Sequence, residues 1–500
     1  MSMQMQPQDP GEGARTQGAG EGARGHWWWP TAFTPWVGNA VRRLSRLAGH
    51  GGSALPGRVV ERLDPGFLAR ALSGLPYGVV LVSGTNGKTT TTRMVATMLE
   101  RLGLKVFTNP TGSNFTRGVV SALLGAVDGS GQLNADIAVL ELDEAYAVHF
   151  VHQIRPRYCL LLNVMRDQLD RFGEIDNTAR LLGEVAKATT GTVVLNREDV
   201  RIARLAAEVS PAAKVSYFGL VNSLRSYFPS DDDMHAADMN DESRAPGAEA
   251  GTDSNGVAST VDDPPTSFAR SPRLDVGREA FVSTAQPADV TLKHVADHEA
   301  EFIIDGASVG GSMRLEGMYN LFNAAAALVI VRAVLADAGR PVDDQRLIAV
   351  LGEVTPAFGR GEVIEVQGTP VELLLVKNPM GFRLSLKSFA PQGHRTMIAI
   401  CDEYADGRDM SWLWDVDFTS LRDTSVAMVS GTRAWDMALR LEYDDVGVEA
   451  TDVDLEQAVT RFVTSDPATP KRIYCTYTAM LRVRAELAGL ADVPDVGVGR

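Results

Sequence analysis

The stretch 83–90 reads Ser-Gly-Thr-Asn-Gly-Lys-Thr-Thr and combines the residue types that hold a phosphate group. Gly84 and Gly87 let the backbone turn its N–H groups toward a bound anion. Lys88 would place its positive charge on the outer phosphates of a nucleotide, and the hydroxyl of Thr89 can reach a Mg²⁺ ion. We therefore expect the protein to bind a nucleoside triphosphate through Gly84, Thr85, Asn86, Gly87, Lys88, Thr89 and Thr90.

The segments on either side of this loop fit a strand before it and a helix after it. An apolar run at 77–82 has strand length, and apolar residues recur at helical spacing at Met94, Val95, Met98, Leu99 and Leu102. The general phosphate-loop pattern asks for a glycine where this chain has Val82, so the loop is a shortened variant. Similar strings occur by chance in turns, and the flanks are what favour phosphate binding here.

The composition excludes several classes of protein. The chain has 500 residues, of which 45% are hydrophobic, enough for more than one sizeable core. A formal net charge of −15 argues against nucleic acid as the main partner. Cys159, Cys401 and Cys475 lie far apart, which is typical of a reducing compartment. Because the sequence shows neither a signal peptide nor a long apolar run, we expect a cytoplasmic protein.

The first fifty residues predict a disordered tail and a short helix. Residues 1–35 lack periodicity apart from Trp27, Trp28 and Trp29. A helix over 36–48 could pack on its own domain. It could also lie on an anionic membrane surface, because arginines flank its apolar face. The second possibility would place the protein at the inner face of the membrane.

The remainder predicts an α/β fold with two units. Strand-like runs alternate with helical stretches at 77–82, 105–108, 136–142, 158–164, 192–196 and 215–218, which predicts a mostly parallel sheet covered by helices. A long helix is expected to start at Met318. A second α/β unit follows, with strands expected at 371–376, 397–400, 426–429 and 472–475.

An acidic segment interrupts the first unit. Between Pro229 and Arg270 the chain has ten Asp or Glu residues against two Arg, with almost no large apolar residues. Such a segment buries too little to offset its ordering entropy and is expected to be disordered. The predicted domains are thus 1–50, 51–355 with an insertion at about 222–287, and 356–500.

Several motifs, taken together, carry a family resemblance. The loop at 83–90 is similar to the nucleotide loop of the Mur ligases and folylpolyglutamate synthases. Seven further strings, in the same order along the chain, resemble the MurT family: 109–114, 141–144, 163–172, 317–320, 358–362, 376–379 and 406–414. The resemblance implies a Mur ligase-like fold, with a central phosphate-loop domain followed by a C-terminal Rossmann-like α/β domain.

The resemblance also implies an activity and partners. Members of the MurT family are synthetase subunits of lipid II isoglutaminyl synthase and work with the glutaminase subunit GatD. The implied reaction uses ATP and Mg²⁺ to convert the α-carboxylate of D-glutamate in the lipid II stem peptide, through an acyl phosphate, into D-isoglutamine. The acceptor would be ammonia from the glutaminase, and no nucleic acid would take part.

Roles for individual residues follow from the same resemblance. Thr89 and Glu141 are expected to hold Mg²⁺, with Glu144 as a competing ligand of lower rank. Asn320 corresponds to an adenine contact, although an asparagine near a helix start is also a common cap. Arg360 resembles an arginine near the ribose and the domain hinge. Lys88 would be catalytic.

In the second unit, an aspartate is expected to complete a Cys-His-Asp arrangement whose Cys and His belong to the glutaminase. Asp409 is the first choice and Asp406 the second. Trp412 and Trp414, two residues apart, would face the same way on an extended segment and could anchor the partner. Packing beneath the loop is the other interpretation of the tryptophans.

Two departures from related families narrow the choice of activity. Ligases that add an amino acid carry a metal-binding His where this chain has Gln168, and a lysine that is absent here at the expected spacing. This favours ammonia over an amino acid as the nucleophile, and so argues against the alternative of an amino-acid ligase. A third possibility, a nucleotide-binding scaffold without activity, is disfavoured because Lys88, Thr89 and Glu141 are all present. Described MurT proteins carry a four-cysteine zinc ribbon, but this chain has no cysteine between Cys159 and Cys401, so no zinc site is predicted.

Overall fold

The computed structural model describes residues 54–109, 114–165, 175–227, 287–296, 298–315, 317–355, 360–403, 405–491 and 493, together with Thr34, Trp36 and Ala40. The helix expected at 36–48 lies mostly outside these residues, although Trp36 and Ala40 are helical. The tryptophan cluster at 27–29, the segment around Gln168 and most of the acidic insertion also lie outside them. Predictions on those segments therefore stay predictions.

The central part of the chain forms a nine-stranded sheet in the order β2-β3-β1-β4-β5-β6-β7-β8-β9. The strands from β2 to β7 in this order run parallel, and β8 and β9 are added antiparallel at one edge. Their bounds are β1 (Val79–Ser83), β2 (Val106–Thr108), β3 (Ile137–Glu141), β4 (Tyr158–Leu161), β5 (Thr192–Asn196), β6 (Lys214–Leu220), β7 (Val290–Ala296), β8 (Glu299–Ile304) and β9 (Ala307–Ser312).

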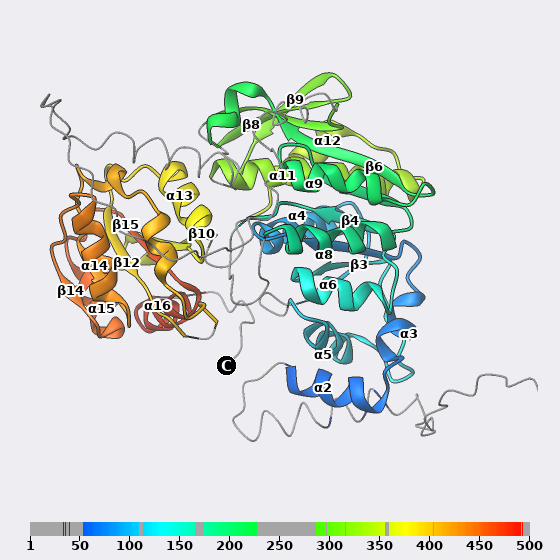
Figure 1. The fold of residues 1–500 in the computed structure, drawn as a ribbon, viewed down its shortest axis with the longest axis horizontal. Coiled ribbons are helices and arrows are strands. Elements are labelled where there is room, and N and C mark those ends of the chain that lie inside the picture. Colours follow the sequence, from blue (N-terminus) through cyan, green and yellow to red (C-terminus); the bar gives the residue numbers. More distant parts are fainter. Residues whose placement is uncertain are drawn as a thin grey trace, which may run out of the picture.

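Helices cover both faces of this sheet (Figure 1). On β1, Val80 and Val82 pack toward one core, whereas Val79 and Leu81 pack toward the other, because alternate side chains of a strand point to opposite faces. One face carries α4 (Lys88–Arg101), α11 (Met318–Asp337) and α12 (Asp344–Gly352). The other carries α2 (Ala54–Leu63), α3 (Phe67–Ser73), α5 (Thr116–Ala126), α6 (Glu144–Val151), α8 (Ile175–Ala188) and α9 (Val200–Arg204).

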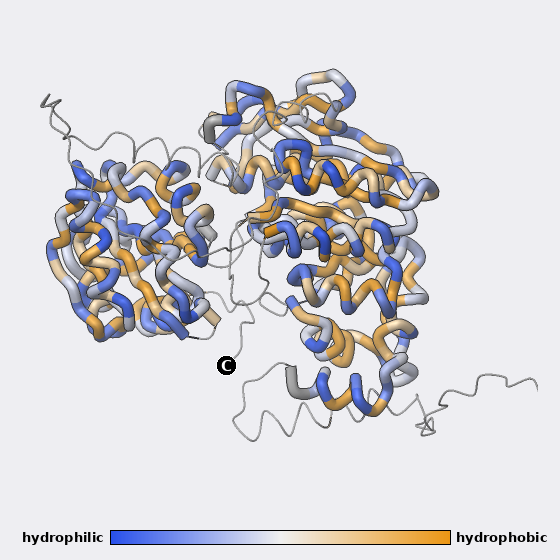
Figure 2. The backbone as a smooth tube through the Cα atoms, viewed as in Figure 1, coloured by the Kyte–Doolittle hydropathy of each residue, from blue (hydrophilic) through white to orange (hydrophobic). Residues whose placement is uncertain are grey.

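Helix α11 is long and apolar enough to span a membrane, but most of it is buried inside the fold, as core helices are. It packs on α4 and against β5, β6 and β7. Figure 2 shows hydrophobic segments running through the centre of this part of the molecule. The start of α11 lies where the sheet's carboxyl edge meets the C-terminal part of the chain, and α11 therefore helps to build the site described below.

The C-terminal part forms a second sheet of six strands in the order β10-β11-β15-β12-β13-β14. Only β10 runs antiparallel among them. The strands are β10 (Arg360–Val366), β11 (Thr369–Leu375), β12 (Arg395–Ala399), β13 (Met428–Ser430), β14 (Thr451–Asp452) and β15 (Lys471–Cys475). On one face lie α15 (Leu455–Thr464) and α16 (Tyr477–Leu490), and on the other lie α13 (Pro379–Ser388), α14 (Ala434–Tyr443) and the 3₁₀ segment η6 (Ser411–Asp415).

The α/β fold with two sheets agrees with the prediction, and two local expectations are wrong. Residues 222–227, expected at the start of a disordered insertion, form the 3₁₀ segment η3 (Asn222–Tyr227). Arg225 in this segment pairs with the buried carboxylate of Glu198 at 2.8 Å, and Leu224 packs on the core, which holds the segment against the sheet. The segment with Trp412 and Trp414 is a 3₁₀ turn rather than extended, so Trp412 is buried and Trp414 is half exposed.

Candidate functional site

The phosphate loop leaves the carboxyl end of β1 in the middle of the central sheet, and α4 begins directly after it at Lys88. Gly84 and Gly87 have φ values of 131° and 87°, which favour glycine. A Cβ atom on Gly84 would lie 3.0 Å from the backbone of Asn163, and one on Gly87 would lie 2.4 Å from Nδ2 of Asn323. The two glycines are therefore required both for the turn and for the close approach of the neighbouring segments.

Lys88 is buried inside this loop. Its Nζ donates to the carbonyl oxygens of Gly84 at 2.6 Å and Thr85 at 3.2 Å, and it pairs with Oδ1 of Asp143 at 3.2 Å. The lysine is thus folded into the space that the loop encloses. From this position, a small rotation of the flexible lysine stem would let its charge meet the phosphates of a nucleotide.

Three carboxylates from the end of β3 and the start of α6 surround the loop. Oε1 of Glu141 accepts a hydrogen bond from the hydroxyl of Thr89 at 2.8 Å, and Asp143 pairs with Lys88. Oε1 of Glu144 lies 3.4 Å from the hydroxyl of Thr85, a longer contact. Glu141 and Thr89 are therefore brought together as predicted, whereas Glu144 faces another part of the loop.

The Thr89 and Glu141 pair fits a Mg²⁺ ion. Mg²⁺ prefers oxygen ligands, keeps several waters, and is commonly held by one or two side chains together with substrate phosphates. Among the described residues, no group of three His, Cys, Asp or Glu side chains is placed to hold a metal alone. A hydroxyl and a carboxylate beside a phosphate loop suit an ion that the nucleotide itself helps to bind.

Two asparagines fix the backbone around the site. Oδ1 of Asn163 accepts from the backbone N–H of Asn86 at 2.8 Å, and its Nδ2 donates to the carbonyl oxygen of Asn86 at 3.0 Å. Asn109 makes the same pair of contacts with the backbone of Glu141, at 2.9 Å and 3.0 Å. The sequence placed both asparagines in family motifs but gave no sign of these contacts, which join segments from different strands.

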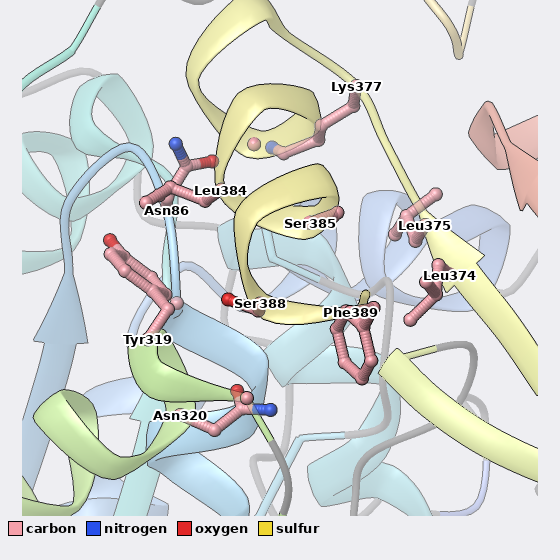
Figure 3. Close-up of a pocket in the computed structure, with 13 residues that line it drawn as sticks. Asn86, Tyr319, Asn320, Leu374, Leu375, Lys377, Leu384, Ser385, Ser388 and Phe389 are labelled. Atoms are coloured by element: carbon pink, nitrogen blue, oxygen red, sulfur yellow. The ribbon is translucent and has the colours of Figure 1, made fainter. Parts of the chain in front are cut away.

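A hollow opens beside the loop, between the central domain and the C-terminal part (Figure 3). Asn86, Gly87, Gly317, Tyr319 and Asn320 line one side. The opposite side comes from β11, the residues after it and α13, with Leu374, Leu375, Lys377, Gly381, Leu384, Ser385, Ser388 and Phe389. A hollow with an apolar wall and a few polar groups next to a phosphate loop has the lining of a nucleotide site.

The structure describes the two residues predicted to contact the nucleoside, Asn320 and Arg360, to different extents. Asn320 lines the hollow beside Gly317, on the far side of Tyr319 from Asn86 (Figure 3), which is compatible with a base contact. Asn323, on the same helical face, is buried against Gly87, and its Nδ2 has no hydrogen-bond partner among the described residues. For Arg360 only the backbone, at the start of β10, is described. The expected roles of Asn320 and Arg360 stay predictions.

Asp409 lies in a separate hollow on the C-terminal part, which shares no lining residue with the first. Its side chain is exposed, and its Oδ1 accepts from the backbone N–H of Ser411 at 2.9 Å. Hydrogen bonding from Ser411 holds the pKa of the Asp409 carboxyl below its usual value. An exposed, charged carboxylate in a hollow can reach a group on another protein.

Asp406 has a different environment. It is buried, accepts from the backbone N–H groups of Thr478 at 2.6 Å and Glu403 at 3.2 Å, and so holds α16 to the loop. Burial raises the pKa of its carboxyl. The structure thus favours Asp409 over Asp406 as the residue that could orient a partner's histidine.

Exposed apolar side chains adjoin the hollow of Asp409. Trp435, Leu439 and Tyr443 lie four residues apart along α14 and are largely exposed. The ring of Trp414 packs edge-on against that of Tyr443, with 5.0 Å between ring centres, and Arg440 lies over Trp414. We call Trp414, Trp435, Leu439 and Tyr443 the α14 face. Of these residues, only Trp414 was singled out from the sequence. The helical spacing of Trp435, Leu439 and Tyr443 looks, in the sequence alone, like that of a core face.

Comparison with known proteins agrees with this architecture. The family model of the Mur ligase middle domain matches residues 82–245, and that of the MurT ligase C-terminal domain matches 375–480. The MurT subunit of lipid II isoglutaminyl synthase (glutamine-hydrolyzing) from Streptococcus pneumoniae is 29% identical over 89% of this chain and 94% of its own length. The subunit of the same name from Staphylococcus aureus is 26% identical, covering 82% of this chain and 86% of its own length.

Solved structures show the same fold. MurF ligase from Thermotoga maritima, in complex with ADP, matches with a TM-score of 0.58 at 17% identity, over 87% of this chain and 84% of its own. Folylpolyglutamate synthase from Mycobacterium tuberculosis, complexed with ADP and AMPPCP, matches with a TM-score of 0.56 at 16% identity, over 91% and 99%. The resemblance and the Mur ligase-like fold expected from the sequence are thereby confirmed.

Proposed function

We propose that this chain, which is similar to MurT proteins over most of its length, is the synthetase subunit of a lipid II isoglutaminyl synthase. It would use ATP to amidate the α-carboxylate of D-glutamate in the lipid II stem peptide. The observation that carries the proposal is the coexistence of two sites on one chain. A phosphate loop with Lys88, Thr89 and Glu141 lies in the central domain, and an exposed Asp409 beside the α14 face lies in the C-terminal domain.

A carboxylate does not react with ammonia at a useful rate, because it is a poor electrophile with a poor leaving group. In the proposed reaction, a carboxylate oxygen attacks the γ-phosphorus of ATP, the bond to the β-phosphate oxygen breaks, and ADP leaves. Ammonia then attacks the carbonyl carbon of the acyl phosphate, loses a proton, and expels phosphate. Phosphoryl transfer of this kind depends mainly on positioning and on neutralisation of charge.

The residues of the loop have distinct tasks in this scheme. The backbone N–H groups around Gly84 and Gly87 orient the phosphates, and Lys88 neutralises the charge that develops on them. Thr89 and Glu141 would hold Mg²⁺, which would neutralise part of the negative charge of the triphosphate. Asn320 would face the base in the hollow next to Gly317.

Ammonia would come from a GatD-like glutaminase subunit bound at the C-terminal domain. Asp409 would accept a hydrogen bond from the histidine of that subunit and stabilise its charged form. Its lowered pKa keeps the carboxylate ionised at neutral pH, as this role requires. The α14 face supplies exposed aromatic and aliphatic groups next to Asp409, and such groups are typical anchors of protein interfaces. The reaction would take place in the cytoplasm, where the lipid II head group is exposed at the membrane.

The experiment is mass spectrometry of lipid II incubated with the protein, ATP and Mg²⁺. One reaction receives a high concentration of ammonium, and another receives glutamine and the glutaminase partner. We expect conversion of one carboxyl to an amide in both. If no amide forms but ATP is consumed once amino acids are added, the protein is an amino-acid ligase and the proposal is wrong.

Two variants assign the sites within that assay. Lys88→Met should abolish amidation with either nitrogen source. Asp409→Asn should lower glutamine-dependent amidation on the order of 10³-fold or more while sparing the ammonia-dependent reaction. Asp436→Asn removes another exposed carboxylate of the same hollow and serves as the control that keeps both. Equal loss of both reactions in Asp409→Asn would place that residue in the synthetase site instead.

A further inference from the structure

The first turn of α13 meets the phosphate loop through a pair of asparagines. Nδ2 of Asn378 donates to Oδ1 of Asn86 at 3.0 Å, across 292 residues of sequence. Asn378 is fully buried, and its Oδ1 accepts from the backbone N–H of Gly381 at 2.7 Å. One side chain therefore caps α13 and also attaches this helix of the C-terminal domain to the loop.

Asn86 is held from its other side as well. Asn163 pairs with both of its backbone groups, and Nδ2 of Asn163 lies 2.5 Å from the hydroxyl of Tyr319 at the start of α11. Figure 3 shows Asn86 and Tyr319 on the same side of the hollow, next to α13. The backbone of Asn86 thus belongs to the central domain's network, while its side chain belongs to the contact with the C-terminal domain. A shift of the loop would be passed to α13 through this residue.

Helix α13 is packed directly against the segment that carries Asp409. Phe382 and Leu386 of α13 share one apolar cluster with Met410, Trp412 and Leu413. The ring of Phe382 also packs edge-on against Phe418, with 5.0 Å between ring centres. Closely packed interiors transmit small displacements instead of absorbing them. Helix α13, which Asn378 caps, and Met410, the residue after Asp409, are therefore parts of one packed layer.

We propose that Asn378 is a positioning residue that couples the state of the nucleotide site to the glutaminase contact at Asp409. This inference rests on the proposed function. A nucleotide that occupies the loop changes the surroundings of Asn86, and it shifts the domain arrangement only to the extent that it favours one arrangement over another. With the Asn86 and Asn378 contact formed, α13 fixes the Asp409 segment for the partner. The complex would then release ammonia mainly when the substrate carboxylate can be activated.

Spatial contiguity alone does not establish coupling, and the decisive measurement is functional. Glutamine hydrolysis by the full complex with its glutaminase partner is measured with and without Mg²⁺, ATP and lipid II. In the wild type, the rate should change several-fold when these are added. In Asn378→Ser the ratio should fall to about one. Serine keeps an oxygen that can cap α13 but is too short to reach Asn86.

Two further readouts separate coupling from simple damage. Asn378→Ser should weaken ATP binding roughly 2- to 10-fold, the range for one neutral hydrogen bond. Its affinity for the partner should equal that of the wild type. Asn86→Ser removes the other half of the contact, so combining both changes should cost little more than either alone.

The matched control is Asp454→Ala. Asp454 caps α15, which like α13 has ten residues and lies in the same domain, by accepting from the backbone N–H of Gln457 at 3.1 Å. Loss of that cap should lower stability without changing the response to nucleotide. A wild-type response in Asn378→Ser, or a wild-type complex that ignores nucleotide, overturns the coupling. If the wild type makes no amide even from ammonium, the proposed function fails with it, and the two failures are thereby distinguished.

Discussion

At the scale of single residues, side-chain amides decide the shape of the phosphate loop. The side chain of Asn163 hydrogen-bonds to the backbone N–H and C=O of Asn86, and that of Asn109 does so to those of Glu141. Only an amide offers one donor and one acceptor in the plane that a backbone residue requires. A carboxylate of the same size can accept but not donate, and an apolar side chain would leave both backbone groups unpaired. The loop and the carboxylate that faces it are therefore fixed by residues that need not touch substrate.

Substitution of Asn163 tests this arrangement. Asn163→Ala should weaken binding of a non-hydrolysable ATP analogue more than Asn163→Asp does, because aspartate retains the acceptor for the N–H of Asn86. Each lost hydrogen bond contributes about 0.5–1.5 kcal/mol, or roughly 2- to 10-fold in affinity. Calorimetric titration measures the order. Asn177→Ala, which removes an exposed contact to Arg180, is the control. Equal affinities for all three variants would show that the hydrogen bonds of Asn163 with the backbone of Asn86 have no role in nucleotide binding.

A second test at this scale concerns Gly87. Its φ of 87° and the position of Nδ2 of Asn323, 2.4 Å from where a Cβ would stand, leave no room for alanine. We expect Gly87→Ala to destabilise the protein by about 1–3 kcal/mol and to abolish nucleotide binding. Gly74→Ala is the control, because Gly74 has φ −83° and no atom within 4 Å of the added group. Chemical denaturation and nucleotide titration report the two effects separately.

At the scale of elements, the sequence predicts strands well where they are buried on both faces. The residues of β1, β3 and β5 are all buried, and each of these strands contains a continuous run of at least three apolar residues. The antiparallel addition of β8 and β9 was not foreseen. β9 contains small residues and is half exposed, and the two residues of β14 are too few to show a pattern. Strand β10 was not predicted, because its first residues had been assigned to the motif at 358–362.

The residues of the candidate site also differ in how well the sequence predicts them. Lys88, Thr89 and the glycines are close in sequence, so a local pattern identifies them. Glu141 was found only because a family motif carries it. The contacts of Asn86 with Asn163 and Asn378 join residues 77 and 292 positions apart, and no local pattern encodes which strands will be neighbours. The tryptophan prediction failed for a related reason, since spacing alone does not distinguish an extended segment from a 3₁₀ turn.

The α14 face gives the prediction that belongs to this scale. Trp435→Ser should reduce affinity for the glutaminase partner by roughly 30-fold, as expected for an aromatic anchor that contributes about 2 kcal/mol. Trp435 is two-thirds exposed, so the fold should not change. The control is Val363→Ser. Val363 is another exposed apolar residue, on the edge strand β10 of the C-terminal sheet, and this variant should bind the partner normally. Partner affinity by calorimetry and ammonia-dependent amidation by mass spectrometry are the readouts. Unchanged affinity in Trp435→Ser would exclude this face from the interface.

At the scale of the whole molecule, the two proposed chemistries occupy different sides of the C-terminal domain. Helix α13 faces the phosphate loop, whereas α14 lies on the side away from the central domain (Figure 1). A partner bound at α14 would leave the hollow between the domains open to ATP and acceptor. In the proposed function, the C-terminal domain would therefore connect ammonia supply to carboxylate activation, in addition to lining the nucleotide site.

The acidic segment offers a test of how much of the chain this machinery needs. Strand β7 pairs in parallel with β6, with Phe218 opposite Val290, and Asp289 is bonded to the backbone of Tyr217 at 2.8 Å. The core residues described on these strands include Phe218, Leu220, Val290 and Leu292. A linker of about twelve Gly and Ser residues has a typical reach of about 19 Å, and a parallel crossover needs about that many residues.

Replacing residues 229–286 by such a linker should leave the fold and the ammonia-dependent amidation intact. The shorter loop should even add about 1 kcal/mol to the free energy of unfolding, because closing it costs less entropy. Thermal unfolding and the mass-spectrometric assay measure both, with a variant that carries the same segment in scrambled order as the control. Loss of folding in the short-linker variant alone would mean that the segment is part of the structure. Loss of the glutamine-dependent reaction alone, with the scrambled control active, would instead tie its length or charge to the partner.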